Sequence, residues 1–307
     1  MQATRGQAVK DLWERVTDNL KLDRLPWLSA NEQTRFSWAK EVECLNDVPE
    51  IFRGAYEAIA GEGGALTYAV LTPRFEGFIR RENRKLVCAL DHKVYILEDS
   101  KEGLLETCYS LQDIHYLEVG SILLNAWIKI VGVAADGLQI SSKLKFNTVT
   151  EYMFAPILNN IRMNGAGSYQ GDISLETGIF DNLGQASFKL MNFARDIFLH
   201  SEKVIEVLLQ PEIKRNLFTI SGRTLFRSIS PAHVSILTDQ ELILIRDGDG
   251  GRWGRGDRHG GVWNYIPLGR IASVSISTRP DDLLVLWISL VGGDQIHTVH
   301  SHTFRVE

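Results

Sequence analysis

The sequence has few cysteines and no long apolar run. Its three cysteines, Cys44, Cys88 and Cys108, are odd in number and lack the spacing of a metal site. Such sparse usage favours a reducing compartment. The first twenty residues contain no apolar core of signal-peptide length. The longest apolar stretch, 283–291, is interrupted by Ser289 and is far shorter than the ~20 residues of a membrane helix. We therefore expect a cytoplasmic protein that is not embedded in a membrane.

Positive charge is also in short supply. The 307 residues carry 33 lysines and arginines against 38 aspartates and glutamates, a formal net charge of −5. A nucleic-acid binder usually has a basic domain, so we expect no nucleic-acid partner. The content of 44% hydrophobic and 23% charged residues is that of a globular protein rather than a disordered one.

The motifs of the common catalytic centres are missing. The sequence contains no G-x-x-x-x-G-K-[ST] and no G-x-G-x-x-G after a strand, and neither G-x-S-x-G nor H-E-x-x-H occurs. Cys88 lies in an apolar strand, where a core role is commoner than a nucleophilic one. We expect a protein that is not an enzyme and needs no cofactor. An enzyme of another type, with a cleft between two strand-rich regions, stays open as an alternative.

Two segments have an incomplete set of metal ligands. The histidines His297, His300 and His302 form H-x-x-H-x-H, but on a strand only the last two face the same side, and a third ligand would have to come from elsewhere. The tract 247–251 begins like a calcium loop and lacks the later oxygen ligands. We therefore expect no metal site.

The apolar spacing changes along the chain from helical to strand-like. Residues 1–64 show stripes at three- and four-residue steps and predict a helical N-terminal region. Short β-branched and aromatic runs then predict strands, closed by a helix over 148–163 that Pro156 should kink or shorten. Gly- and Ser-rich residues 164–173 predict a linker, and the stripe over 184–210 predicts one long helix. Strand patterns return after it and continue to the C-terminus.

The two strand-rich regions match each other in three blocks. Residues 86–99 align without a gap to 234–247. An apolar quartet recurs at one offset, and Trp127–Gly132 matches Trp287–Gly292. The quartet members are Leu111, Ile114, Leu117 and Val119 in the first region, and Leu268, Ile271, Val274 and Ile276 in the second. We interpret this as a duplication and divide the chain into 1–64, a first unit 65–163, a linker and helix 164–212, and a second unit 213–307. Trp127 and Trp287 should then be equivalent and largely buried.

These residues resemble a known family. The stretch ILTDQELILIRD followed by YIPLGRIASVSI, between Ile236 and Ile276, is similar to the bacterial pleckstrin-homology-like domains. The first copy, ALDHKVYILED followed by YSLQDIHYLEV, is similar but lacks the Thr. The resemblance implies an α+β fold of two tandem antiparallel β-barrel or sandwich units, with the helical N-terminal region and an interdomain helix. Each barrel should be plugged by a C-terminal helix, which 148–163 supplies in the first unit. The second unit has no such segment after its strands, so we expect 184–210 to pack on it or to bridge both units.

Two basic segments are candidate binding residues. Five basic residues fall within twelve positions of this chain: Arg74, Arg80, Arg81, Arg84 and Lys85. In the resembled fold this segment is an early hairpin, which holds phosphoinositide headgroups in eukaryotic relatives, and arginine suits phosphate. A glycine-rich tract over 246–263 carries Arg252, Trp253 and Arg255, which could bind an anion or stack on a ring. The bland interpretation is a self-paired, solvated hairpin for the first and a mobile loop for the second.

The resulting expectation is a non-enzymatic binding or scaffold protein. Its two modules would present sheet edges or hairpin loops to a protein partner or to further copies of the chain. The alternative is peripheral membrane or anionic-ligand binding through the Arg74–Lys85 hairpin.

Overall fold

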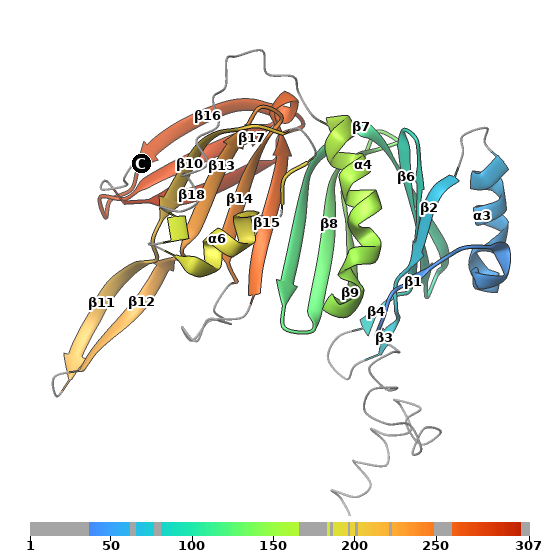
Figure 1. The fold of residues 1–307 in the computed structure, drawn as a ribbon, viewed down its shortest axis with the longest axis horizontal. Coiled ribbons are helices and arrows are strands. Elements are labelled where there is room, and N and C mark those ends of the chain that lie inside the picture. The colour runs from blue at the N-terminus through green and yellow to red at the C-terminus, as the bar shows by residue number, and fades with distance from the viewer. Residues whose placement is uncertain are drawn as a thin grey trace, which may run out of the picture.

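The computed structural model describes residues 37–61, 66–76, 81–165, 183–184, 187–195, 197–199, 202–220, 223–248 and 260–301. Strands dominate this part of the chain, and all their pairings are antiparallel (Figure 1). No helix in it is long and apolar enough to cross a membrane.

The first strand set follows the order of the chain. It consists of β2 (Leu66–Leu71), β5 (Lys85–Leu90), β6 (Lys93–Ser100), β7 (Gly103–Ile122), β8 (Asn125–Ala134) and β9 (Gln139–Asn147). The short strand β1 (Lys40–Glu41) pairs with β2 at one edge, and β3 (Phe75–Glu76) and β4 (Arg81–Glu82) form a small hairpin between β2 and β5. Because β7 is twenty residues long, its first part pairs with β6 and the rest with β8.

The second strand set has the same order of elements. It consists of β10 (Val204–Gln210), β13 (His233–Thr238), β14 (Glu241–Asp247), β15 (Gly260–Pro267), β16 (Ile271–Thr278), β17 (Leu284–Leu290) and β18 (Gln295–His300). A hairpin of β11 (Ile213–Ile220) and β12 (Arg223–Ser230) lies between β10 and β13 and projects from the body of the molecule (Figure 1). It occupies the position in the chain order that the small β3–β4 hairpin has in the first set.

The two sets share ladder registers. Lys85 pairs with Glu98 between β5 and β6, and His233 with Arg246 between β13 and β14, so both strands are offset by 148 residues (233 minus 85, 246 minus 98). In the next ladder Lys93 pairs with Ser110 and Glu241 with Pro267, which makes β15 offset from β7 by 157 (267 minus 110). Both offsets equal those of the first two sequence blocks.

One continuous ladder joins the sets. Strand β15 pairs with the second half of β7, from Gly260 opposite Ile122 to Tyr265 opposite Leu117. This pairing merges the first set with β10, β13, β14 and β15 into one eleven-stranded sheet, while β16, β17 and β18 form a separate three-stranded sheet. The main core therefore contains side chains from both sets, for example Leu117 and Val119 with Ile243 and Ile245.

Three α-helices lie on the faces of this sheet in the described residues. Helix α3 (Glu50–Gly61) packs Phe52, Tyr56 and Ile59 on the outer face of the first set, over β6 (Figure 1). A 3-10 helix, η3 (Thr148–Phe154), leads into α4 (Ala155–Gly165), which contacts both β7 and β15. Helix α6 (Phe188–Arg195) packs on β14.

The structure corrects the predicted fold class. Large open antiparallel sheets replace the two expected barrels, and no closed barrel is formed by the described residues. The predicted α+β fold with a helical N-terminal region and an interdomain helix is also wrong. Within the region 1–64, which was expected to be helical, residues 40–41 form strand β1 and Leu45–Asp47 form a 3-10 helix. The apolar stripe at 9–20 lies outside the described residues.

The long helix over 184–210 is wrong as well. Residues Val204–Gln210 are strand β10, because alternating Val204, Val207 and Leu209 pack on the core from an edge paired with β13. A short run of aliphatic residues fits both helical and strand spacing, and the available edge decides between them. The shorter α6 still buries Leu190, Met191 and Ala194 in the main core against β14. The helix after the first set forms as predicted, with Pro156 in the first turn of α4.

The two tryptophans are not equivalent. Trp127 pairs with Gly120 and Trp287 with Ser275, whereas the 157-residue offset makes Gly120 correspond to Ser277 (120 plus 157). Both indoles are half-buried rather than largely buried. Their N–H groups donate to Glu118 Oε1 at 3.0 Å and to Ser277 Oγ at 2.8 Å, and the inward positions beside them belong to Ile128 and Ile288.

Candidate functional site

The first predicted basic cluster is only partly assembled. Arg74 and Arg84 line a common hollow of ≈ 920 Å³ between β1, the start of α3 and the end of β2. Lys85 faces elsewhere and is neutralised, with its Nζ 3.0 Å from Glu98 Oε2 and 2.9 Å from the Lys143 carbonyl oxygen. Arg81 belongs to β4, and its side chain and the whole of Arg80 lie outside the described residues.

The hollow has a mixed lining. Arg53 and Lys40 add two cations to it, while Glu41 and Asp47 oppose them. The Asp47 carboxylate accepts the backbone N–H of Cys44 at 3.1 Å and its thiol at 3.3 Å, and these hydrogen bonds lower the pKa of Asp47. Four cations against two anions leave the hollow with an excess of positive charge, suited to a small anion.

The other predicted candidates do not form a site among the described residues. The tract 249–259, with Arg252, Trp253 and Arg255, lies outside them, and so does the predicted mobility of that tract. His302 does too. His300 is buried beside His233, with ring centroids 4.9 Å apart, and burial together with this neighbour lowers the pKa of His300 to about 4. His297 is exposed and stacks near Trp287 instead. No group of three metal-ligating side chains is present in the described part.

Strand β16 is an exposed edge. It pairs with β17 on one side, and no described strand pairs with its other side. Nearly all of its residues are exposed, including the large apolar Val274 at 56% and Ile276 at 67%. An exposed apolar edge strand presents unpaired backbone groups and invites pairing with another chain.

The corresponding stretch of the first set is covered. Leu117 and Val119, which the 157-residue offset matches to Val274 and Ile276, are 2% and 5% exposed. They are buried because α4 packs on β7 and because β15 pairs along this half of β7 and brings Trp263 and Tyr265 against them. The same type of strand is therefore covered in one set and exposed in the other, and its edge is covered by a strand of the neighbouring set.

A second bare edge lies at the start of β7. Residues 103–107 pair with β6 on one side, while the other side of β7 is occupied only from Cys108 onward, where the Cys108 carbonyl oxygen accepts the Ala135 N–H and Tyr109 pairs with Ala134. Leu104 and Leu105 are 37% and 49% exposed there. The matching stretch of the second set is β15, whose same edge pairs with β7.

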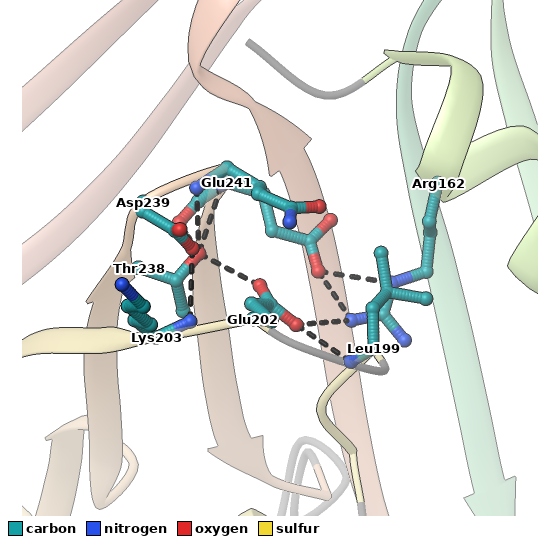
Figure 2. Close-up of polar contacts among 8 residues, drawn as sticks. Arg162, Leu199, Glu202, Lys203, Thr238, Asp239 and Glu241 are labelled. Atoms are coloured by element: carbon teal, nitrogen blue, oxygen red, sulfur yellow. Dashed lines mark hydrogen bonds and ion pairs between the residues drawn. The ribbon is translucent and has the colours of Figure 1, made fainter. Parts of the chain in front are cut away.

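A buried ion cluster locks the two sets together behind the β7–β15 ladder. Figure 2 shows Arg162 of α4 reaching to Glu241 at the start of β14 and to Glu202 before β10. Arg162 Nε donates to Glu241 Oε1 at 2.9 Å, Nη2 donates to the same oxygen, and Nη2 lies 3.5 Å from Glu202 Oε2. The guanidinium also lies over the Tyr265 ring, 4.0 Å from its centroid. All four side chains are buried.

The acidic side of the cluster is held by further hydrogen bonds. Glu202 accepts the Leu199 backbone N–H and the Thr238 hydroxyl, both at 2.7 Å. Glu241 has less support: its Oε2 has no hydrogen-bond partner. Burial, only partly offset by Arg162, raises the pKa of Glu241 to about 7. One guanidinium thus faces two carboxylates. Ionising the second carboxylate is unfavourable because the single positive charge cannot compensate both buried negative charges.

Sequence reasoning missed both the ion cluster and the bare edges. A signal for the cluster was present in the aligned copies: Thr238 and Glu241 stand where the first copy has Leu90 and Lys93. A polar residue replacing a core leucine indicates a role that only the second copy has. The edges depend on which strands pair between the sets, and no local pattern encodes that.

No protein-family model matches the chain, and no curated protein matches it.

Proposed function

We propose that this chain is a non-enzymatic assembly protein that associates with further copies of itself through the exposed edge of β16. The observation that carries the proposal is this edge, with its exposed Val274 and Ile276. Strands at natural sheet edges are normally short, charged or covered, and β16 has no charged residue between Ile271 and Thr278. An uncharged sequence of this kind is typical of a strand that is paired on both of its edges.

The molecule itself supplies the precedent for how the edge is covered. Strand β15 already joins the two sets by adding to β7, and this contact buries Leu117 and Val119. Strand addition gains backbone hydrogen bonds for affinity and side-chain contacts for register. Burying an exposed aliphatic side chain adds up to roughly 1.5–3 kcal/mol.

Sedimentation velocity tests the proposal. The native chain should form species larger than a monomer, in proportions that rise with concentration. Replacing Ile276→Glu should shift it to the monomer, because an edge carboxylate would have to be desolvated in a paired sheet. Leu138→Glu, at a residue 61% exposed between β8 and β9, is the matched control and should leave assembly unchanged. A native chain that stays monomeric at every concentration would overturn the proposal.

The location and family of the protein belong to the same proposal. The three free cysteines support a cytoplasmic site of action. The resemblance to bacterial pleckstrin-homology-like domains is supported by the motifs in the sequence and by the strand order that the two sets share, without the barrel closure of that family.

A second candidate function is binding of an anionic ligand in the hollow lined by Arg53, Arg74 and Arg84. Arginine suits phosphate because its planar fork donates two parallel hydrogen bonds. Vesicles of phosphatidylcholine with phosphatidylserine should then bind the chain at low salt and release it at high salt. Arg84→Glu should abolish this binding, while Arg215→Glu, at an exposed arginine on β11, should not. Equal binding by both variants would exclude the hollow.

A further inference from the structure

The two bare edges of the molecule are complementary. The first is the start of β7, residues 103–107, and the second is β16. Inside the chain, the strand that corresponds to the first edge (β15) pairs with the strand that corresponds to the second (the end of β7). Both partners of a known contact therefore recur as edges that no described strand covers, one in each set.

We infer that copies of this chain assemble head to tail, with residues 103–107 of one copy adding as an antiparallel strand to β16 of the next. The inference rests on the proposed function and names the partner surface for it. Each contact would repeat the backbone pairing of the internal β7–β15 contact and bring Leu104 of one copy onto the same face as Ile276 of the other, as its diagonal neighbour.

The internal ladder also fixes the register. Asn264 pairs with Glu118 and Gly260 with Ile122. Subtracting the offset of 157 from the β15 residue and adding it to the β7 residue gives Thr107 opposite Ser275 (264 minus 157, 118 plus 157) and Gly103 opposite Arg279 (260 minus 157, 122 plus 157). Between these limits Glu106 lies directly opposite Ile276. Leu105, one residue earlier, points to the other face of the sheet.

The symmetry of the contact follows from its surfaces. Residues 103–107 and β16 are different surfaces, so the contact is heterologous and leaves a pair of copies with one edge of each kind still exposed. Such contacts close into a ring or extend into a filament, depending on the rotation between copies. A contact of β16 with β16 would instead be isologous and would stop at a dimer.

Disulfide trapping between two separately made variants tests the inference. Both carry Cys44→Ser and Cys108→Ser, so that Cys88, which is buried, is the remaining native thiol. One variant adds Glu106→Cys and the other Ile276→Cys. Directly opposite residues of an antiparallel pair lie about 4.5–5.5 Å apart at Cα, within the range a disulfide spans. The mixture should form a disulfide-linked pair under mild oxidation, and neither variant should do so alone.

The control mixture combines Leu105→Cys with Ile276→Cys, which places the two thiols on opposite faces, and its cross-link should be lost. Cross-linking of the Ile276→Cys variant by itself would show that two β16 strands meet and would overturn the head-to-tail contact. So would equal yields from the test and control mixtures while the native chain still sediments as an assembly. A native chain that does not assemble at all would overturn the proposed function together with this inference.

Discussion

Arg162 is the side chain on which the contact between the two strand sets most depends. It supplies the single positive charge that faces Glu202 and Glu241, and its guanidinium covers the Tyr265 ring. A buried ion pair is a weak source of net stability, but removing one partner leaves the other charge buried without compensation. The cluster therefore acts as a specific connection between α4 of one set and β14 of the other.

Arg162→Met should destabilise the protein by roughly 3–5 kcal/mol at pH 8, because two buried carboxylates then lose their counter-charge. The cost should be smaller at pH 5.5, where Glu241 is protonated. Urea unfolding at the two pH values measures this. Arg215→Met is the control, since its ion pair with Asp281 is solvent-exposed on the arginine side and should contribute about 1 kcal/mol or less. A small, pH-independent effect of the Arg162 change would contradict the account.

Glu241 should make stability fall as the pH rises. In the unfolded chain this carboxyl ionises near 4.5, and in the folded protein its pKa is about 7. Folding is therefore favoured fully below pH 4.5 with respect to this group, and that contribution is lost as the pH rises to 7. Glu241→Gln removes the titration. The free energy of unfolding of the variant, minus that of the native chain, should increase between pH 4.5 and 7 by up to about 1.4 kcal/mol per pH unit.

Measuring that difference, rather than either curve alone, is necessary because His300 acts in the opposite direction. Its pKa is lowered to about 4, so its contribution to stability is lost as the pH falls from 6.5 toward 4. The His300 contribution is the same in both proteins and cancels. A difference that stays constant from pH 4.5 to 7 would show that Glu241 does not titrate there.

At the scale of elements, the β7–β15 ladder is the feature that shapes the molecule. It requires a close approach of the two backbones at Gly260, where a β-carbon would lie 2.5 Å from the Ser121 carbonyl oxygen. Glycine has no β-carbon and is therefore the residue that this approach tolerates.

Gly260→Ala should therefore push β15 away from β7 and destabilise the protein by roughly 1–3 kcal/mol, the usual cost of overpacking. Chemical denaturation measures the loss. Gly269→Ala is the matched control, because the added methyl group has no atom within 4 Å there and the backbone is not left-handed. Equal stability of the two variants would mean that the ladder yields without cost at this point.

Local elements could be predicted where one pattern had one physical solution. The gap-free match of 86–99 to 234–247 gave the register of two hairpins, because a strand pair with one buried face cannot slip by one residue. Pro156 indicated a break in the helix expected over 148–163, and the 3-10 helix η3 gives way to α4 beside it. The stripe over 184–210 failed because aliphatic residues satisfy both periods, and Val204–Gln210 found a vacant edge beside β13. The predicted equivalence of Trp127 and Trp287 was wrong. The residues around the two tryptophans are similar, but their positions opposite the neighbouring strand differ by two residues.

At the scale of the whole molecule, the arrangement is that of one sheet built across two sets, with one exposed strand edge in each set. Residues 103–107 and β16 could not be found from the sequence, since their apolar residues look the same as those of covered strands. The packing of α4 and the β15 pairing, which joins residues more than a hundred positions apart, distinguish Leu117 from Val274.

Backbone amide hydrogen exchange at two protein concentrations tests head-to-tail assembly most directly, because it reports the pairing of each strand. Within residues 103–107 and 271–278, the backbone amides that do not donate to β6 or β17 should exchange rapidly in dilute protein and become protected together in concentrated protein. Strand β15 should be protected in both. Protection that does not change with concentration in either segment, or that appears in β16 alone, would contradict the account.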